Sequence, residues 1–482
     1  MIIGSIISGK ERNEKSRTTH EVKNPFDGST VATLALSTAD DLNEAVEAAH
    51  KAFENKMKAM PAHERADILR KAARLLGERE DEFQQSITAE SGKPVKQARK
   101  EVERSKQLLL YAAEEAKKIG GEVVPMDAAI GGDNRLGFVK KTPLGVVGAI
   151  TPFNFPLNLS LHKLAPAIAA GNTIVFKPAE KTPVTGYKLV KLLHEAGMPE
   201  DALHLIIGTG SEIGTPLVEH EKVAKISFTG SVPVGKSIQK AAGFKKVTLE
   251  LGSNSPNIVF EDADWKDAAE RIVAGGFGYS GQTCISAQRI YVHRDIFDSF
   301  TDELVRLANN LKIGDPADAS VDIGPMITED EAKRAEEWVE SALSKGAKAA
   351  LKGERSGAML PPVILTDVTD DMHVVQKEVF APILAVIPFG TEDEAVRRAN
   401  DSIYGLQAAV FTKNIDRAFR VADRIESGGV WINDASTYRQ DNYPYGGVKQ
   451  SGIGREGVKY AVDEMLELKF IGVKLDGGPP RV

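Results

Sequence analysis

The stretch LGVVGAIT, residues 144–151, decides the fold of this chain, because every residue before Thr151 is apolar or glycine. A strand that is apolar at consecutive positions is buried on both faces, which is typical of a parallel sheet covered by helices. Three similar runs follow, separated by helical patterns: TIVFKPA at 173–179, KISFTG at 225–230 and KVTLEL at 246–251. This alternation predicts a doubly wound α/β sheet.

The rest of the chain extends this pattern in both directions. Upstream, residues 39–118 carry apolar residues at helical spacing, and Asp40 or Asp41 is placed to cap the first helix. Downstream, strands and helices alternate again from about 255 to 450, with the strand-like runs NIVF, RIYV, ILAVIPF, AAVFT and GGVWI. A chain of 482 residues exceeds what one hydrophobic core usually supports. We therefore expect two doubly wound, Rossmann-like α/β domains.

A small β element is expected beside these domains. Residues 119–141 hold two β-prone runs around a glycine-rich turn, which predicts a protruding hairpin. The strand-like LELKFIGVKL, residues 466–475, lies near the end of the chain. Because the hairpin has few apolar residues to bury by itself, we expect it to pack on a neighbouring subunit.

Composition excludes several classes of function. The formal net charge is −7 with no long basic run, so nothing attracts nucleic acid or an anionic membrane. No apolar stretch approaches the ~20 residues that span a bilayer, and the first residues lack the basic start of a signal peptide. One cysteine permits no internal disulfide and fits a reducing compartment. We expect a cytoplasmic protein with no metal site, since no clustered Cys/His pattern occurs.

The single cysteine, Cys284 in SGQTCISAQ (residues 280–288), has two interpretations. A lone thiol is commonly a small buried hydrophobe. The alternative is a nucleophile that attacks a carbonyl. The Asn154 amide, just past a strand, and the Cys284 backbone N–H could then donate to the developing oxyanion. Glu250 ends another strand, where apolar neighbours would raise its pKa into the range of a base that activates water.

Nucleotide-binding groups are expected at the carboxyl ends of the first set of strands. The glycines of Gly208–Gly214 are spaced one residue too widely for the dinucleotide fingerprint, and a plain strand-to-helix turn explains them equally well. Ser231 and its neighbouring backbone N–H groups could hold a pyrophosphate at a helix N-terminus. Lys177 ends a third strand, and Glu180 could accept both hydroxyls of an adenosine ribose while repelling a 2′-phosphate. This favours NAD and leaves NADP possible.

These pieces together resemble the aldehyde dehydrogenase superfamily over almost the whole chain. Seven motifs occur in the family's order: PFNFP at 152–156, KPAE at 177–180, FTGS at 228–231, LELG at 249–252, GQTC at 281–284, KEVF at 377–380 and PYGGVK at 444–449. One departure is Ser253, which stands where the family commonly has a second glycine. The resemblance implies NAD(P)-dependent oxidation of an aldehyde through a cysteine thiohemiacetal and thioester.

The resemblance also implies roles for individual residues. Cys284 would be the nucleophile, Asn154 the oxyanion donor and Glu250 the base for deacylating water. The cofactor would contact Lys177, Glu180, Gly210, Ser231, Glu378 and Phe380. Residues 1–118 and 142–250 would form the dinucleotide-binding domain and 251–462 the catalytic domain. Residues 119–141 and 463–482 would form the oligomerisation element of a homodimer or homotetramer.

The substrate is expected to be a small-molecule aldehyde that meets five residues: Arg104, His162, Thr283, Ile285 and Arg439. Arg104 and His162 resemble residues of the glyceraldehyde-3-phosphate-oxidising branch, and His162 also resembles lactaldehyde dehydrogenases. We expect a small polar or hydroxylated aldehyde such as lactaldehyde or glycolaldehyde, with a semialdehyde or an aromatic aldehyde as alternatives. A coenzyme A-acylating enzyme and a catalytically inactive scaffold on the same fold are further alternatives. The presence of Glu250, which acylating members typically lack, argues against the first of these.

Overall fold

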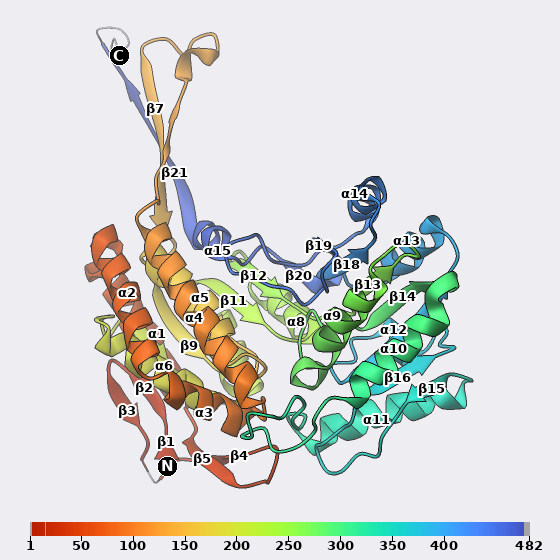
Figure 1. Cartoon of the computed structure of the whole chain (residues 1–482). Helices are drawn as coiled ribbons and strands as arrows, with labels where there is room; N and C mark the ends of the chain where they lie inside the picture. The colour runs from red at the N-terminus through yellow and green to blue at the C-terminus, as the bar shows by residue number, and fades with distance from the viewer. Residues whose placement is uncertain (1, 15, 477–482) are drawn as a thin grey trace.

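The structure is a computed structural model that describes residues 2–14 and 16–476. Two large sheets lie side by side, each covered by helices, and a narrow β arm projects from the body (Figure 1). The expected α/β fold class with two doubly wound sheets and a small β element is confirmed.

The first large sheet has five parallel central strands. They lie in the order β12 (Lys246–Glu250), β11 (Val223–Thr229), β8 (Val146–Ile150), β9 (Thr173–Lys177) and β10 (Leu203–Leu205). Short antiparallel strands complete the edges: β20 (Gly452–Ile453) beside β12, and β2 (Ser5–Ile7) with β3 (Lys10–Arg12) beside β10. Because the chain runs from β8 through β9 and β10 and then returns to β11, the strand order reverses between β8 and β11.

Burial on both faces explains why β8 is apolar throughout. Val147 and Ala149 pack in the cluster that contains α5 (Asn158–Ala170) and α6 (Pro183–Glu195). Val146 and Ile150 pack in the cluster on the other face, formed with α1 (Ala39–Asn55), α7 (Thr215–Glu219) and α8 (Val232–Ala241). Alternate side chains of a strand point to opposite faces, so both sets must be apolar.

The second large sheet is also covered by helices on both faces. Its six parallel strands lie in the order β16 (Val363–Thr366), β17 (Ile383–Phe389), β14 (Arg289–His293), β13 (Pro256–Val259), β18 (Gln407–Phe411) and β19 (Gly429–Ile432), with β15 (Lys348–Leu351) antiparallel beside β16. One face is covered by α9 (Trp265–Phe277) and α10 (Phe297–Asn309). The other is covered by α11 (Glu329–Ser344), α12 (His373–Gln376), α13 (Glu392–Asn400) and α14 (Ile415–Arg424).

The predicted helical segment contains α1, α2 (Ala62–Glu78), α3 (Glu80–Ser91) and α4 (Val95–Ala116). The residue that caps α1 is Thr38, so the prediction of Asp40 or Asp41 as the cap is wrong. The Thr38 hydroxyl accepts the Asp41 backbone N–H (3.2 Å), and the Asp41 carboxylate accepts the Thr38 N–H (2.7 Å). Asp41 is therefore the third residue of a capping box, where a side chain reaches back to the residue that begins the helix.

Two smaller sheets complete the fold. Near the amino terminus, β1 (Ile2–Ile3), β5 (Thr30–Ala35) and β4 (Thr19–Lys23) form a sheet that the sequence analysis did not predict. The arm consists of β6 (Glu122–Val124), β7 (Arg135–Pro143) and β21 (Leu466–Lys474), all antiparallel, so the predicted hairpin is confirmed (Figure 1). Residues 477–482 of the expected oligomerisation element lie outside the described residues. Within the described ranges, no helix combines the length and hydropathy needed to cross a membrane.

Candidate active site

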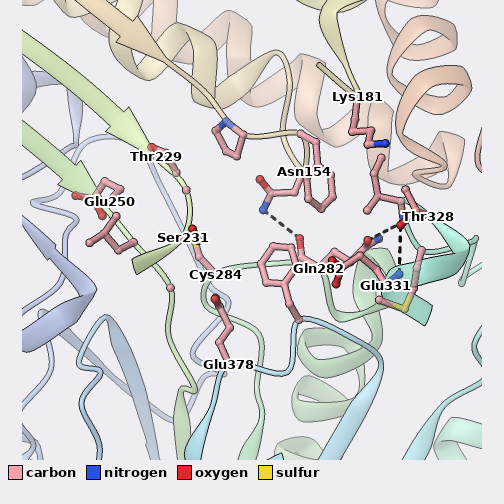
Figure 2. Close-up of a pocket in the computed structure, with 18 of the residues that line it drawn as sticks. Asn154, Lys181, Thr229, Ser231, Glu250, Gln282, Cys284, Thr328, Glu331 and Glu378 are labelled. Atoms are coloured by element: carbon pink, nitrogen blue, oxygen red, sulfur yellow. Dashed lines mark hydrogen bonds between the residues drawn. The ribbon is translucent and has the colours of Figure 1, made fainter. Parts of the chain in front are cut away.

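A cavity of about 530 Å³ lies where β11 and β12 end, next to the loop that follows β8 (Figure 2). It is also bordered by the loop that carries the single cysteine and by residues of the segment 326–331. Residues from many parts of the chain therefore meet in one space. Six of the predicted site residues line it: Asn154, Ser231, Glu250, Cys284, Glu378 and Phe380.

The loop that presents Cys284 has an unusual backbone. Tyr279 and Ser280, directly after α9, both adopt left-handed conformations (φ 49° and 54°), which are costly for residues other than glycine. Two hydrogen bonds hold them there, from the Tyr279 hydroxyl to the Ser91 carbonyl (3.0 Å) and from the Ser280 hydroxyl to the Gly324 carbonyl (2.7 Å). The sharp turn leaves Cys284 half-buried and facing the cavity.

The electrostatics of the thiol oppose its ionisation. Burial raises the pKa of Cys284 to about 11, while the Tyr445 hydroxyl, 3.1 Å from Sγ, and the Arg439 charge partly offset this effect. The sulfur is therefore protonated at neutral pH unless further contacts favour the thiolate, which is the nucleophilic form.

Asn154 joins the loop after β8 to the cysteine loop. Its Nδ2 donates a hydrogen bond to the Gln282 carbonyl (3.1 Å), and the Gln282 side-chain oxygen accepts the Ile327 backbone N–H (2.9 Å). A primary amide nitrogen carries two hydrogens, so one remains for a ligand in the cavity. Gln282 was missed by the sequence analysis, because any residue type supplies a backbone carbonyl and its side chain binds a backbone N–H 45 residues away.

Glu250 is the last residue of β12 and is almost completely buried. Neither of its carboxylate oxygens has a hydrogen-bond partner among the residues that the structure describes. Burial, and secondly the negative charge of Glu456, raise the pKa of Glu250 well above its ordinary value. Burial therefore favours the protonated form of Glu250, in the direction predicted from its apolar surroundings.

Glu456 lies beside this site and has the opposite character. It accepts hydrogen bonds from Lys163 Nζ (3.0 Å) and Arg439 Nη2 (3.0 Å). Burial opposes its charge, but Lys163, His162 and Arg439 outweigh burial and lower the pKa of Glu456 to about 2. Lys163 and Glu456 were missed by the sequence analysis, because 293 residues separate them in the chain.

A second cavity, of about 280 Å³, lies between β8 and β11, where the strand order reverses. Ligands of doubly wound sheets bind at this point. Lys177 and Gly210 line this cavity, and it shares Pro152, Thr229 and Gly230 with the first, so the two cavities are neighbours. A dinucleotide fits this arrangement, with one end between the strands and the other beside the thiol.

Ser231 and Glu180 differ in how they face this space. Ser231 begins α8, but its hydroxyl makes no capping hydrogen bond within the described chain, so the helix N-terminus is open to an anion. Glu180 lies 3.8 Å from Lys177 Nζ, and its side chain borders a neighbouring cavity with Lys181 rather than the one beside Gly210.

Glu378 and Phe380 close the other end of the first cavity. The Ser253 backbone N–H donates to Glu378 Oε1 (3.1 Å), and a side chain at Gly252 would collide with that carboxylate. Burial raises the pKa of Glu378 to about 7. Phe380 adopts φ 53° and packs edge-on against Phe153, with the ring centroids 5.9 Å apart.

Comparison with known proteins identifies this architecture. The sequence model described as the aldehyde dehydrogenase family matches residues 12–471. The chain belongs to the aldehyde dehydrogenase family. The predicted activity, NAD(P)-dependent oxidation of an aldehyde, is therefore confirmed as a class.

Three relatives illustrate the similarity of this aldehyde dehydrogenase to known proteins. It is 48% identical over 455 residues to a 3-sulfolactaldehyde dehydrogenase from Priestia aryabhattai, covering 94% of this chain and 95% of the relative. It is 42% identical over 469 residues to a lactaldehyde dehydrogenase from Methanocaldococcus jannaschii, covering 96% and 99%. A crystal structure of a glyceraldehyde-3-phosphate dehydrogenase from that organism, complexed with NADP, matches with a TM-score of 0.92, 42% identity and coverage of 95% and 100%.

Three of the predicted substrate residues of this aldehyde dehydrogenase meet at Asp441. Arg104 Nη2 and His162 Nε2 lie 2.7 Å and 3.0 Å from the same Asp441 oxygen, and Arg439 Nη2 lies 3.1 Å from His162 Nε2. Burial opposes the charge of Asp441, but His162, Arg104 and Arg439 lower its pKa. Asp441 was missed by the sequence analysis, since a lone aspartate in a loop carries no recognisable signal.

The other two predicted substrate residues behave differently. Ile285 is buried and packs with Leu406 and Tyr445. Thr283 is half-buried. None of the five predicted substrate residues lines the cavity that Gln282 and Cys284 border.

Proposed function

We propose that this aldehyde dehydrogenase oxidises a short hydroxylated aldehyde to the free acid through a covalent intermediate on Cys284. The observation that carries the proposal is the convergence of the Cys284 thiol, the Asn154 amide and the Glu250 carboxylate on one cavity. A nucleophile, an oxyanion donor and a base are the three groups that acylation and hydrolysis of a carbonyl compound require.

The reaction would proceed in two stages. The thiolate of Cys284 attacks the aldehyde carbon, and the carbonyl electron pair moves to an oxygen held by the free N–H of Asn154. A nicotinamide held by Glu378 and Phe380 beside Cys284 would supply the acceptor for the hydride of that carbon, so that Cys284 would then carry a thioester. Glu250 then takes a proton from water, whose oxygen attacks the thioester carbon, and the C–S bond breaks to release the carboxylic acid. Each donor to the oxyanion contributes about 3–4 kcal/mol to lowering the barrier.

We propose that the cofactor lies along the two neighbouring cavities. Lys177 and Gly210 would border its adenosine, the α8 N-terminus with Ser231 its pyrophosphate, and Glu378 with Phe380 its nicotinamide riboside. A carboxylate at Glu180 favours the free ribose hydroxyls of NAD, yet its side chain is 37% exposed and able to move aside for a 2′-phosphate. We therefore propose dual use of NAD and NADP, with NAD preferred.

The charge balance around Asp441 supports a polar substrate with an anionic end. Arg104, Arg439 and Lys163 supply three cations, while Asp441 and Glu456, whose pKa values are lowered, supply two anions. Burial lowers the pKa of His162, which keeps it neutral at pH 7. One positive charge is left over. The names of the relatives include neutral and anionic aldehydes. Lactaldehyde is neutral, whereas 3-sulfolactaldehyde and glyceraldehyde 3-phosphate carry anionic groups.

Domain roles and assembly are further parts of the proposal. Residues 1–118 and 142–250 would bind the dinucleotide, 251–462 would carry the chemistry, and the arm would join subunits of a homodimer or homotetramer. Exposed apolar side chains on the arm, such as Val123, Leu468 and Phe470, support this assembly because they are costly to leave in water. An enzyme whose one thiol is its nucleophile needs a reducing compartment, so we propose that it works in the cytoplasm.

The experiment that tests the chemistry is an NADH-release assay with the Cys284→Ala variant. Turnover should disappear, and unchanged turnover would end the proposal. Adding coenzyme A to the unchanged enzyme separates the acylating alternative, which predicts turnover only in its presence. A catalytically inactive scaffold would give no turnover with any aldehyde.

The substrate is tested with a panel of lactaldehyde, glycolaldehyde, 3-sulfolactaldehyde, succinate semialdehyde and benzaldehyde. Arg104→Ala should raise KM for the anionic members about tenfold or more, because a charged hydrogen bond is lost, and should change KM for lactaldehyde little. Arg99→Ala is the matched control, since Arg99 lies on the same helix but is exposed. Equal losses across the panel would remove Arg104 from substrate recognition.

A further inference from the structure

Tyr445 is in direct contact with the sulfur of Cys284. Its hydroxyl oxygen lies 3.1 Å from Sγ, and within residues 2–14 and 16–476 it is the only hydrogen-bonding partner of that sulfur. The side chain is 1% exposed and packs with Ile285 and Leu406. A buried phenol needs a partner for its hydroxyl, and here that partner is the predicted nucleophile.

The position of Tyr445 is fixed on both sides. Its backbone N–H donates to the Glu456 carbonyl (3.0 Å), and its carbonyl accepts the Glu456 N–H (2.6 Å). The Arg439 guanidinium carbon lies 3.6 Å from the centre of the tyrosine ring. Arg439 is itself held by Glu456 and His162. The hydroxyl is therefore pre-positioned rather than free to rotate away.

The charge above the ring has a chemical consequence. A guanidinium that stacks on an aromatic face attracts its π electrons, so the phenol O–H becomes a stronger hydrogen-bond donor. Burial keeps the pKa of Tyr445 well above its ordinary value, so the proton stays on the oxygen. Tyr445 can thus donate to an anion but does not act as a base.

We propose that Tyr445 is a catalytic residue whose hydroxyl donates a hydrogen bond to the Cys284 thiolate and, with Arg439 on its ring, stabilises the nucleophile before attack. The proposal rests on the proposed role of Cys284. In this step the thiol S–H bond breaks and the proton leaves to water. The sulfur keeps the electron pair, and no bond to Tyr445 forms. Burial disfavours the thiolate, and this hydrogen bond offsets part of that effect.

The test uses the full-length enzyme and exploits its single cysteine. Because Cys284 is the only thiol in the chain, the rate of alkylation by iodoacetamide reports that residue alone. Tyr445→Phe removes one oxygen and keeps the ring. The midpoint of the alkylation pH profile should rise by about one unit, which corresponds to about tenfold less thiolate at pH 7. kcat/KM at neutral pH should fall in parallel and recover as pH rises.

Tyr443→Phe is the matched control. The Tyr443 hydroxyl donates to the Tyr438 carbonyl (3.3 Å) and makes no hydrogen bond to the sulfur within the described residues, so its removal should leave the alkylation profile in place. Equal melting temperatures for the two variants would show that both fold. An unchanged alkylation profile in Tyr445→Phe would overturn the proposal, whatever happens to turnover. Failure of the proposed function is distinguishable from this result, because it would appear as turnover in the Cys284→Ala variant.

Discussion

Glu250 and Glu456 are both buried carboxylates beside the cysteine cavity, with 3% and 1% of their surfaces exposed, yet they are opposite in character. Glu250 has no hydrogen-bond partner in the described chain, and its pKa is raised by burial. Glu456 is held by Lys163 and Arg439, which lower its pKa to about 2 despite burial. Burial alone therefore does not decide the charge of a carboxylate. Direct hydrogen bonds to cations do, because Lys163 and Arg439 act on both carboxylates but bond only to Glu456.

The two groups also act on each other. The permanent charge of Glu456 is the second cause that raises the pKa of Glu250. A fixed anion thus helps to set the proton affinity of the neighbouring base, and two carboxylates in one region take different tasks because their surroundings differ. Four experiments test this difference between Glu250 and Glu456.

The largest effect is expected for Glu250→Gln. Removing the base for water should slow hydrolysis of the thioester by about a thousandfold, while formation of the thioester continues. We expect a burst of about one NADH per active site, followed by very slow turnover, with the acylated protein visible by intact mass spectrometry. Steady turnover at the unchanged rate would show that another group activates water.

A large loss of stability is expected for Lys163→Met. This change leaves the buried Glu456 without its ammonium partner, which costs about 3 kcal/mol or more in the free energy of unfolding. Urea denaturation at pH 7 measures the loss. Adding Glu456→Leu should restore only part of it, because the unpaired carboxylate is then gone but Arg439 loses its own contact with Glu456.

Lys58→Met is the control for that experiment. Lys58 pairs with Glu54 on the surface, and both side chains are about half exposed. Such a pair contributes less than about 1 kcal/mol. A loss as large as that of Lys163→Met would mean that removal of any lysine destabilises the chain, and that the buried pair has no special role.

Stability should depend on pH in opposite directions for the two carboxylates. Glu456 has a folded-state pKa below the ordinary 4.5, so its stabilising effect is present above pH 4.5 and is lost as pH falls towards 2. Glu250 has a raised folded-state pKa, so its stabilising effect is present below pH 4.5 and is lost as pH rises through its folded pKa. Glu250→Gln should therefore be more stable than the unchanged enzyme at pH 7 and equal to it near pH 4, as measured by urea denaturation.

The smallest effect is expected for the influence of the Glu456 charge on the pKa of Glu250. Glu456→Gln removes the negative charge that raises the pKa of Glu250, so the acidic limb of the deacylation rate should move to lower pH by about one unit or less. Single-turnover hydrolysis of a preformed acyl-enzyme, followed across pH, measures this limb. A limb that stays in place or moves to higher pH would mean that the charge of Glu456 does not raise the pKa of Glu250.

Sequence patterns predicted the scaffold of the site well. The strands that end at Lys177 and Glu250 and the loop that carries Asn154 follow from apolar runs with polar residues at their carboxyl ends. The first three-stranded sheet was missed because its strands are short and partly exposed, so neither alternation nor a continuous apolar run marks them. The cap of α1 was misassigned because Thr38, Asp40 and Asp41 all fit a helix start, and only the backbone geometry distinguishes them.

The sequence by itself determined which residues stand at the carboxyl ends of the strands and which one thiol is available, because strand periodicity and residue identity are local properties. The protonation of those groups and the identity of their partners depend on the folded arrangement of the chain. Tyr445 reaches Cys284 across 161 positions and Lys163 reaches Glu456 across 293. Burial and charge act through space, so pKa values and hydrogen bonds depend on neighbours that the order of residues does not reveal.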